Sequence, residues 1–193
     1  MTKIIGLTGG IGSGKTTIAR LFMAAAVPVY IADDEARKLM QSEEIIQEIK
    51  AKFGTTIFEN DVLNRQKLAE IVFNNPEKLK LLNGIIHPAV KKDFDVWVLN
   101  QKQASFVIYE TAILFESGSY KNCDHIIAVT APIETRIQRV MQRDNASREQ
   151  IMTRINSQWT DEQRIAKSDF VIENDTVETT KLEVDKILKI LNN

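Results

Sequence analysis

Short apolar runs alternate with amphipathic stretches along most of this chain. The runs typical of strands buried on both faces occupy residues 3–8, 27–31, 105–109, 125–130 and 169–173. Apolar residues at helical spacing follow the first, fourth and fifth runs, at 16–26, 132–144 and 176–191. Strands that alternate with helices predict an α/β fold with a five-stranded parallel sheet.

Helix-boundary residues add detail near the end of the chain. Asp175 offers an N-cap for the last helix, with Glu178 in its first turn. Two capping boxes, at 147–150 and 160–163, predict short helices before the last strand. We expect residues 144–167 to form a helical lid of the kind that excludes water from a phosphate site.

The second and third strands lie too far apart for one crossover, which needs roughly thirty residues. The stretches of helical patterning between them are 43–53, 65–73, 76–82 and 88–100. Breaks are expected at Gly54, Asn74-Asn75-Pro76, Gly84 and His87-Pro88. This pattern predicts a single domain, 1–193, in which a core that holds the strands (1–40 and 105–193) carries a helical insertion (41–104). The nine basic and nine acidic residues at 41–104 balance, which favours a small-molecule pocket and leaves a scaffolding insert open.

Residues 9–16, Gly-Gly-Ile-Gly-Ser-Gly-Lys-Thr, match the phosphate-loop pattern G-x-x-x-x-G-K-[ST] between a predicted strand and a predicted helix. Glycines let successive backbone N–H groups converge on an anion, and a helix N-terminus adds further unpaired N–H groups. In such a loop Lys15 reaches the β- and γ-phosphates, and the Thr16 hydroxyl holds Mg²⁺. The alternative, an ordinary glycine turn, leaves Lys15 and Thr16 unexplained.

Composition limits the partners and the cellular location that we expect for this protein. A net charge of −1 over 193 residues implies no polyanion-binding surface, so we expect no nucleic-acid partner. The one cysteine, Cys123, excludes an internal disulfide and is better explained as a partly buried thiol than as a nucleophile. We find no signal-peptide pattern and no apolar stretch near the ~20 residues of a membrane helix, and we expect a cytoplasmic protein without membrane contact.

Acidic residues follow two predicted strands at the edge where parallel sheets bind ligands. Asp33 is a candidate to accept the proton of an acceptor hydroxyl, or to hold Mg²⁺ through water. Capping of the next helix by Asp33 or Asp34 explains the same residues equally well. Glu110 ends the third strand where a metal-positioning carboxylate is expected, and Glu116 is a weaker candidate that also fits a solvated side chain.

Arg136, Arg139 and Arg143 share one face of the helix at 132–144. Nucleotide phosphates would compensate these three like charges. The alternative is a solvated stripe that pairs with Glu134 and Asp144.

Residues 8–17 closely resemble the phosphate loop of dephospho-coenzyme A kinases, and the likeness continues along nearly the whole chain. The other matching segments are 28–33 (PVYIAD), 63–68 (LNRQKL), 72–73 (VF), 86–88 (IHP), 114–116 (LFE), 131–143 with its arginines, Gln158, and 169–174 (DFVIEN).

The resemblance implies transfer of the γ-phosphoryl of ATP, with Mg²⁺, to the ribose 3′-hydroxyl of dephospho-coenzyme A, the last step of coenzyme A synthesis. It also implies a P-loop kinase core with a substrate-binding insertion and a lid, and we expect a monomer or a weak homo-oligomer. By position, the residues at the ATP phosphates are Gly10, Gly12, Ser13, Gly14, Lys15, Thr16 and Thr17. Arg139 and Arg143 would face the nucleotide and Asn174 the adenine. Asp33 would be the general base, working with Lys15 and Arg139, and Arg65, His87 and Glu110 would lie on the acceptor side.

Three positions depart from the family pattern. Ile31 stands where the family has the first Asp of Asp-Ala-Asp, and Glu110 stands where the family usually has an Asp and then a Pro. The glycine that the family often has soon after the asparagine is missing, and Asp175 follows Asn174 instead. A regulatory GTPase is disfavoured because the Asn-Lys-x-Asp and Asp-x-x-Gly motifs are missing. A nucleoside monophosphate kinase and a non-catalytic ATP-binding module stay open as alternatives.

Overall fold

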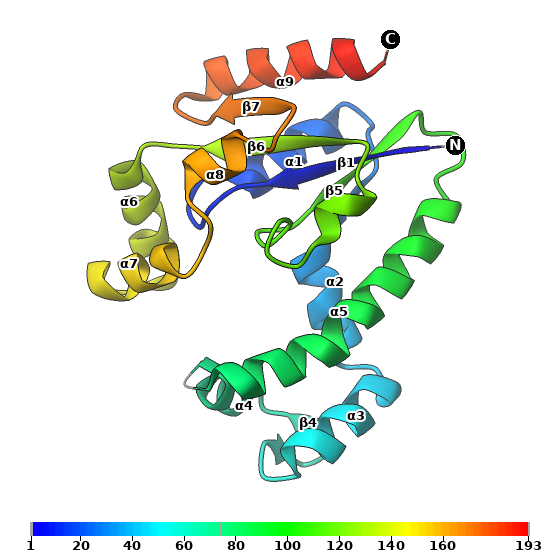
Figure 1. Cartoon of the computed structure of the whole chain (residues 1–193), viewed down its shortest axis with the longest axis vertical. Coiled ribbons are helices and arrows are strands. Elements are labelled where there is room, and N and C mark those ends of the chain that lie inside the picture. Colours follow the sequence, from blue (N-terminus) through cyan, green and yellow to red (C-terminus); the bar gives the residue numbers. More distant parts are fainter. Residues whose placement is uncertain (1, 74, 193) are drawn as a thin grey trace. The chain divides into compact units, whose positions relative to one another are not determined.

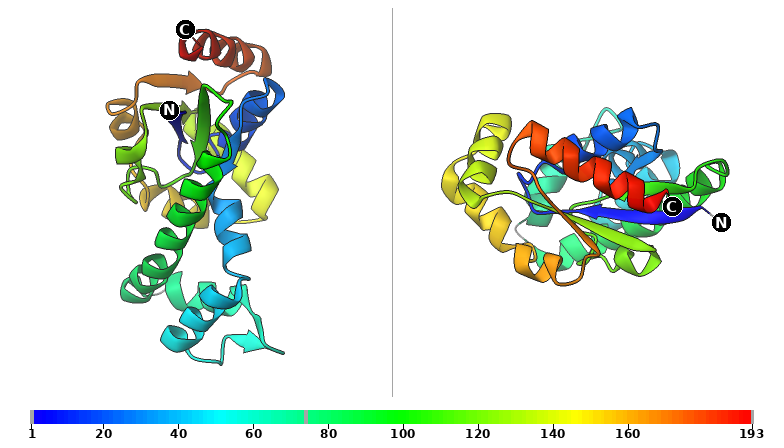
Figure 2. Two further views of the ribbon diagram at one scale, coloured as in Figure 1. Left: turned by 90° about the vertical axis from the view of Figure 1, so that its right-hand side faces the viewer. Right: turned by 90° about the horizontal axis from the view of Figure 1, so that it is seen from above.

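The computed structural model describes residues 2–73 and 75–192, so Asn74, one of the expected helix breaks, lies outside the described residues. The chain divides into two compact units. The sheet unit comprises Met1–Ile31 and Asn100–Asn193, and the helical unit comprises Ala32–Leu99. Figures 1 and 2 show the elements of each unit, coloured along the chain. Among the described residues, no helix combines the length and the apolar character needed to cross a membrane.

Five parallel strands form the sheet, which confirms the predicted fold class. They are β1 (Lys3–Thr8), β2 (Val29–Ile31), β5 (Phe106–Glu110), β6 (His125–Thr130) and β7 (Phe170–Glu173). Their order across the sheet is β2-β5-β1-β6-β7, and every pairing is parallel. The strands β1 and β6 have the predicted bounds, and the other three shift by one or two residues.

The register brings the ends of three strands into one row. Ile31 pairs with Glu110, and Glu110 pairs with Leu7. Because β1 ends at Thr8, the loop that begins at Gly9 leaves the sheet at the edge where β2 and β5 also end. Ligands of open parallel sheets bind at this carboxyl edge.

The helices α1 (Lys15–Ala24) and α9 (Val177–Leu191) cover one face of the sheet (Figure 2). Alternate strand residues such as Ile5, Leu7 and Ile127 meet them in one core. On the opposite face, Leu114 lies so close to β1 that a Cβ at Gly6 would stand 2.7 Å from its Cδ2. The strands are therefore buried on both sides, as their apolar runs predict.

The rest of the sheet unit consists of short helices. They are η1 (Ser119–Asn122), α6 (Ile133–Asp144), α7 (Arg148–Asn156) and α8 (Asp161–Ile165). Both predicted capping boxes are confirmed, at the starts of α7 and α8. The predicted cap of α9 was wrong by one residue: the helix begins at Val177, so Thr176 is the N-cap and its hydroxyl accepts from the N–H of Thr179.

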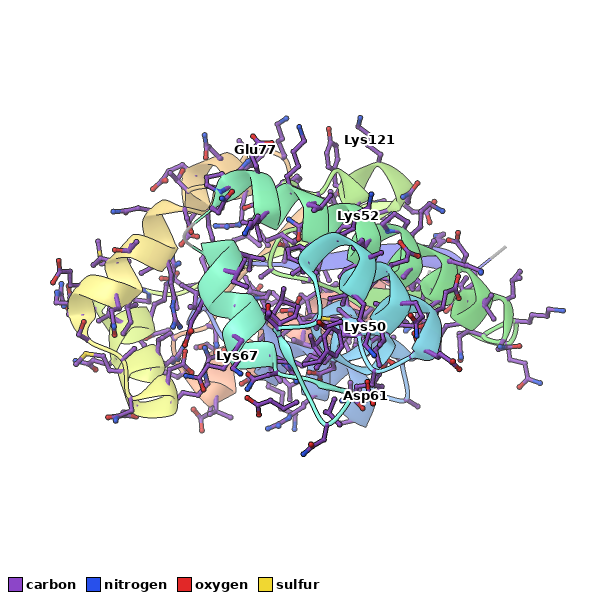
Figure 3. All side chains as sticks on the ribbon, turned by 90° about the horizontal axis from the view of Figure 1, so that it is seen from below. Lys50, Lys52, Asp61, Lys67, Glu77 and Lys121 are labelled. Carbon is purple, nitrogen blue, oxygen red and sulfur yellow. The ribbon has the colours of Figure 1, made fainter. Side chains whose placement is uncertain are left out.

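The helical unit contains α2 (Ala32–Leu39), α3 (Glu43–Phe53), α4 (Arg65–Phe73) and α5 (Pro76–Leu99), and α5 packs against the other three. It also contains a hairpin that the pattern did not predict, formed by β3 (Phe58–Glu59) and β4 (Val62–Leu63). Strands of two residues are too short to show an alternation of apolar and polar positions. Asn60 and Asp61 make the turn with φ of 49° and 63°, and Asp61 pairs with Lys50 at 3.0 Å (Figure 3).

The two helices predicted at 76–82 and 88–100 are one helix, so the breaks at Gly84 and at His87-Pro88 were wrong. A proline inside a helix loses one hydrogen bond and crowds the carbonyl four residues earlier, at a cost of about 3 kcal/mol. That earlier residue is Gly84. Burial of apolar side chains on both sides of Pro88 offsets the cost; they are Ile85, Ile86, Val90 and Phe94.

We expect Phe22→Ala to lower the free energy of unfolding by about 3–5 kcal/mol, because the fully buried ring joins α1 to the sheet core. Urea denaturation measures this loss. The neighbouring Met23, 41% exposed on the same helix, is the matched control, and Met23→Ala should change stability by no more than ~0.5 kcal/mol. Equal effects of the two substitutions would contradict the assignment of the core.

Candidate functional site

Two hydrogen bonds to backbone carbonyls hold the loop between β1 and α1, one from a backbone N–H and one from a side chain. The N–H of Ser13 donates to the carbonyl of Gly10 at 3.1 Å, and Lys15 Nζ donates to the carbonyl of Gly9 at 2.9 Å. Gly12 and Gly14 have φ of 79° and 93°, which side chains other than glycine rarely adopt. This conformation turns the chain tightly between strand and helix.

Neighbouring groups approach these glycines too closely for any side chain. A Cβ at Gly12 would lie 2.5 Å from the carbonyl oxygen of Arg136, and a Cβ at Gly14 would overlap the amide nitrogen of Asn174. The pattern of glycines therefore has two causes here, the backbone conformation and the packing of α6 and Asn174 against the loop.

Polar groups at this loop fit a phosphate ligand. The helix α1 begins after Gly14 with no side-chain cap, and the N-terminus of a helix favours an anion. The Ser13 hydroxyl is buried and has no hydrogen-bond partner among the described residues. The side chains of Thr16 and Thr17 are exposed at the start of the helix. These are the donors and hydroxyl oxygens that a phosphate group and its Mg²⁺ require.

Arg139 and Asn174 meet the loop from two other elements. Asn174 Nδ2 donates to the Ser13 carbonyl at 2.8 Å, and its Oδ1 accepts from the Thr180 hydroxyl at 3.1 Å. Arg139 donates to the Asn174 carbonyl at 3.1 Å and lies 3.5 Å from the carbonyls of Gly12 and Ser13. No carboxylate pairs with Arg139 within the part of the chain that the structure describes. Its charge is thus available to an anion at the loop.

The three arginines of α6 lie in different environments. Arg136 is only 5% exposed and pairs with Asp161 at 2.8 Å, so the interpretation as a phosphate ligand was wrong for this residue. Arg143 binds the Asp144 carboxylate through both Nε (2.7 Å) and Nη2 (3.1 Å), and this contact lowers the pKa of Asp144. The expected partner Glu134 instead pairs with Arg148 at 2.7 Å.

The helical unit holds three of the predicted site residues. Asp33 is the second residue of α2 and lies in its first turn, while Asp34 beside it pairs with Arg37 at 2.6 Å. Arg65 begins α4 and is exposed. His87 is half-buried within α5, and burial lowers its pKa, so its imidazole is neutral near pH 7.

The predicted acidic site residues of the sheet unit, Glu110 and Glu116, lie in different environments. Glu110 is buried at the end of β5, in the row that it shares with Leu7. Glu116 is not simply solvated, because it accepts from the N–H of Trp159 at 3.0 Å and from Arg164 at 3.4 Å. The Cys123 thiol is mostly buried beside Asp124, which raises its pKa to about 12, so it is not an activated nucleophile.

Sequence reasoning missed the buried ion pairs that join Arg136 and Arg164 to Asp161. Spacing shows which residues share a helix face, yet a buried arginine and an exposed one look alike in a single sequence. Asp161 was recognised only as part of a capping box, and that signal says nothing of its partners.

Comparison with known proteins decides between the kinase classes. The sequence profile of the dephospho-CoA kinase (CoaE) family matches residues 3–179. The chain belongs to the dephospho-CoA kinase family. Its activity is therefore that of an ATP-using kinase that phosphorylates dephospho-CoA in the final step of coenzyme A biosynthesis, as the resemblance implied.

Individual relatives agree with this membership. The chain is 42% identical over 172 residues to the dephospho-CoA kinase of Bacteroides fragilis strain YCH46, covering 89% of this chain and 84% of that one. Among solved structures, Thermus thermophilus TT1252 matches with a TM-score of 0.87 and 32% identity, over 99% of this chain and 96% of that chain. The dephospho-CoA kinase of Campylobacter jejuni matches with a TM-score of 0.71 and 28% identity, over 98% and 96% of the two chains.

We expect Gly14→Ala to weaken ATP binding by roughly ten-fold or more, because the new Cβ would displace Asn174 from the loop. Titration calorimetry with ATP measures the change. Gly118→Ala is the matched control, since Gly118 has a similar φ of 78° but nothing within 4 Å of its Cβ position. If both variants bind ATP equally, the packing of Asn174 against Gly14 does not matter for ATP binding.

Proposed function

We propose that, in the dephospho-CoA kinase reaction, the phosphate loop holds ATP and Asp33 activates the ribose 3′-hydroxyl of dephospho-coenzyme A. The observation that carries the proposal is the phosphate loop itself. Its tight glycine turn, its uncapped helix and the nearby Arg139 all favour an anion at one place.

In this proposal the phosphates of ATP lie against the N–H groups of the loop. The residues concerned are Gly10, Gly12, Ser13, Gly14, Lys15, Thr16 and Thr17. The Lys15 ammonium moves from the Gly9 carbonyl to the β- and γ-phosphates and stabilises their charge. Mg²⁺, when bound, neutralises charge on the phosphates; the Thr16 hydroxyl would hold it, with Asp33 or Glu110 contacting it through water.

Arg139 and Arg143, two of the three arginines of α6, differ in whether they must first release a carboxylate to bind the nucleotide. Arg139 contacts only carbonyl oxygens in the sheet unit, so it can stabilise charge on the transferring phosphoryl group without leaving a carboxylate. Arg143 would have to release Asp144 to face the nucleotide. Asn174, fixed to the loop at Ser13, would lie near the adenine.

Two observations support Asp33 as the general base. The strand β2 ends at Ile31 in one row with Glu110 and Leu7, and Asp33 follows two residues later along the chain. Among the described residues the Asp33 carboxylate has no ion pair, whereas the adjacent Asp34 is occupied by Arg37. A carboxylate without a cationic partner stays available to accept the proton of the attacking hydroxyl.

The rest of the helical unit would bind the acceptor. Arg65 presents an exposed cation, which suits the anionic diphosphate group of a coenzyme A precursor. His87 is neutral and can donate or accept a hydrogen bond without attracting a counter-ion. Residues 144–167 would act as the lid that excludes water during transfer.

The decisive experiment measures ADP release with candidate acceptors in a coupled assay. We expect release to depend on dephospho-coenzyme A and to stay near background with AMP, CMP or GMP.

Lys15→Ala should lower kcat by about 10²-fold or more, because charge on the γ-phosphoryl loses its stabilisation. Equal rates with a nucleoside monophosphate would overturn the acceptor assignment, and full activity without Lys15 would overturn the role of the loop.

Asp33→Asn should lower kcat by roughly 10²-fold or more while ATP affinity stays within a few-fold, because the amide cannot accept the hydroxyl proton. Steady-state kinetics and ATP titration together measure the two effects. Asp34→Asn is the matched control, since its exposed pair with Arg37 contributes little. An unchanged kcat in Asp33→Asn would exclude Asp33 as the base.

A further inference from the structure

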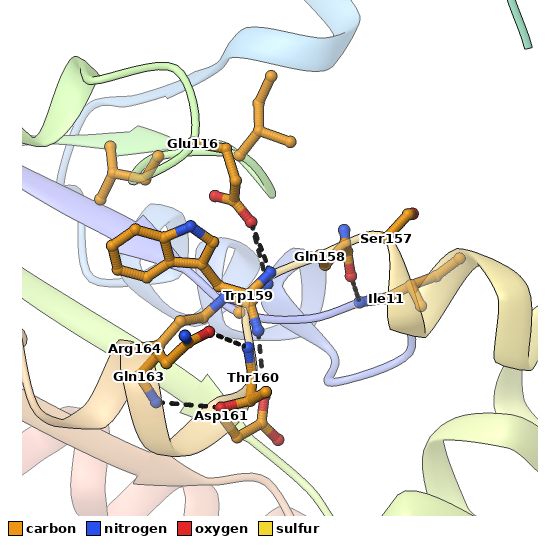
Figure 4. A network of polar contacts seen from close by, with 12 residues as sticks. Ile11, Glu116, Ser157, Gln158, Trp159, Thr160, Asp161, Gln163 and Arg164 are labelled. Carbon is orange, nitrogen blue, oxygen red and sulfur yellow. Dashed lines mark hydrogen bonds and ion pairs between the residues drawn. The ribbon is translucent and has the colours of Figure 1, made fainter. Parts of the chain in front are cut away.

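One residue of the phosphate loop, Ile11, is held by side chains at both its N–H and its carbonyl. Its N–H donates to Gln158 Oε1 at 2.9 Å, and its carbonyl accepts from Arg136 Nε at 2.9 Å (Figure 4 shows the Gln158 contact). Gln158 comes from the segment between α7 and α8, and Arg136 comes from α6. Two hydrogen bonds on one residue restrain both of its backbone dihedral angles.

Arg136, which holds the Ile11 carbonyl, is itself held by ion pairs. Arg136 pairs with Asp161 at 2.8 Å, and Asp161 also accepts from Arg164 at 3.2 Å. Arg164, 1% exposed, reaches Glu116 at 3.4 Å. Two guanidinium groups and two carboxylates balance, which allows these charges to be buried together.

Gln158, which holds the Ile11 N–H, is itself positioned by the contacts of the next two residues. Trp159, next to Gln158, donates its N–H to Glu116 at 3.0 Å and stacks on Phe115 with ring centroids 5.0 Å apart. The hydroxyl of Thr160 then caps α8 (Figure 4). The Gln158 side chain therefore extends from a backbone that is held on its C-terminal side.

Gly10 in the phosphate loop is explained by the position of Arg136. A Cβ at Gly10 would overlap the guanidinium of Arg136, so Gly10 is needed for Arg136 to lie against the loop. The Gly10-Ile11 pair exceeds what the general phosphate-loop pattern requires. The approach of Arg136 accounts for Gly10, whereas the two hydrogen bonds to Ile11 use its backbone atoms and do not depend on its side chain.

We propose that Gln158 is a positioning residue for the phosphate loop. By accepting the hydrogen bond of the Ile11 N–H, it fixes the tip of the loop before any nucleotide arrives, in the conformation that would receive the phosphates. This inference rests on the proposed binding of the ATP phosphates at the loop. Pre-ordering lowers the entropic cost of binding, so Gln158 acts on ATP affinity and not on the acceptor.

The coupling works in both directions. If Gln158 improves ATP binding by ordering the loop, bound nucleotide must stabilise the Gln158–Ile11 contact by the same factor. Nucleotide binding then orders the segment around Gln158, at the base of the expected lid.

Gln158→Met tests the proposal, because methionine keeps the length and removes the acceptor. In the nucleotide-free protein, we expect the Ile11 amide to exchange hydrogen at least ten-fold faster than in the wild type, measured by NMR. The KM for ATP should rise roughly five- to ten-fold, the scale of one lost hydrogen bond, with the KM for dephospho-coenzyme A and the urea midpoint unchanged. Gln142→Met, an exposed glutamine of α6, is the control and should alter none of these values.

Gln158→Glu provides the second variant, since a carboxylate oxygen accepts the same hydrogen bond and should keep the Ile11 amide protected. Unchanged Ile11 exchange in Gln158→Met, or loss of protection in Gln158→Glu, would overturn the proposal. Equal rises in KM for both substrates would also overturn it. These results leave wild-type turnover of dephospho-coenzyme A untouched, so they are distinguishable from a failure of the proposed function.

Discussion

The site depends on how closely other parts of the chain approach the backbone of one loop. Arg136, Arg139 and Asn174 each contact the carbonyl oxygens of residues 11–13. When carbonyls are occupied on the outer side of a turn, those N–H groups of the turn that are not themselves bonded within the chain can point inward. This division of the backbone groups turns a glycine-rich connection into an anion site. It also explains why Gly10 and Gly14 tolerate no side chain: the space that a Cβ needs is filled by the Arg136 guanidinium and the Asn174 amide, which hold the carbonyls.

The sequence contained most of what positions this loop. Five apolar runs predicted the five parallel strands because strands buried on both faces leave an unmistakable run of apolar residues. The loop motif was readable since it joins a strand to a helix, and the capping boxes were readable because capping is a local interaction. The membership of the kinase family followed from motifs spread along the chain.

What the sequence did not reveal depends on tertiary contacts. The single helix α5 overrides two local breaking signals, because burial of Ile86 and Val90 is a property of the folded unit and not of the segment. The burial of Arg136 in α6 depends on its ion pair with Asp161, a carboxylate 25 residues further along the chain. The β3–β4 hairpin is invisible because two residues per strand carry no periodicity. In each case the deciding partner is distant in sequence or the signal is too short.

The lone thiol has a practical consequence. Cys123 lies against β1, where its sulfur would be 3.0 Å from a Cβ at Gly6, and its high pKa leaves almost no thiolate near neutral pH. Because the side chain is half-buried and its thiol stays protonated near neutral pH, we expect an alkylating reagent to modify the native enzyme slowly, and faster when local opening exposes the sulfur. The rate of Cys123 alkylation can therefore report local opening next to β1, without an engineered label.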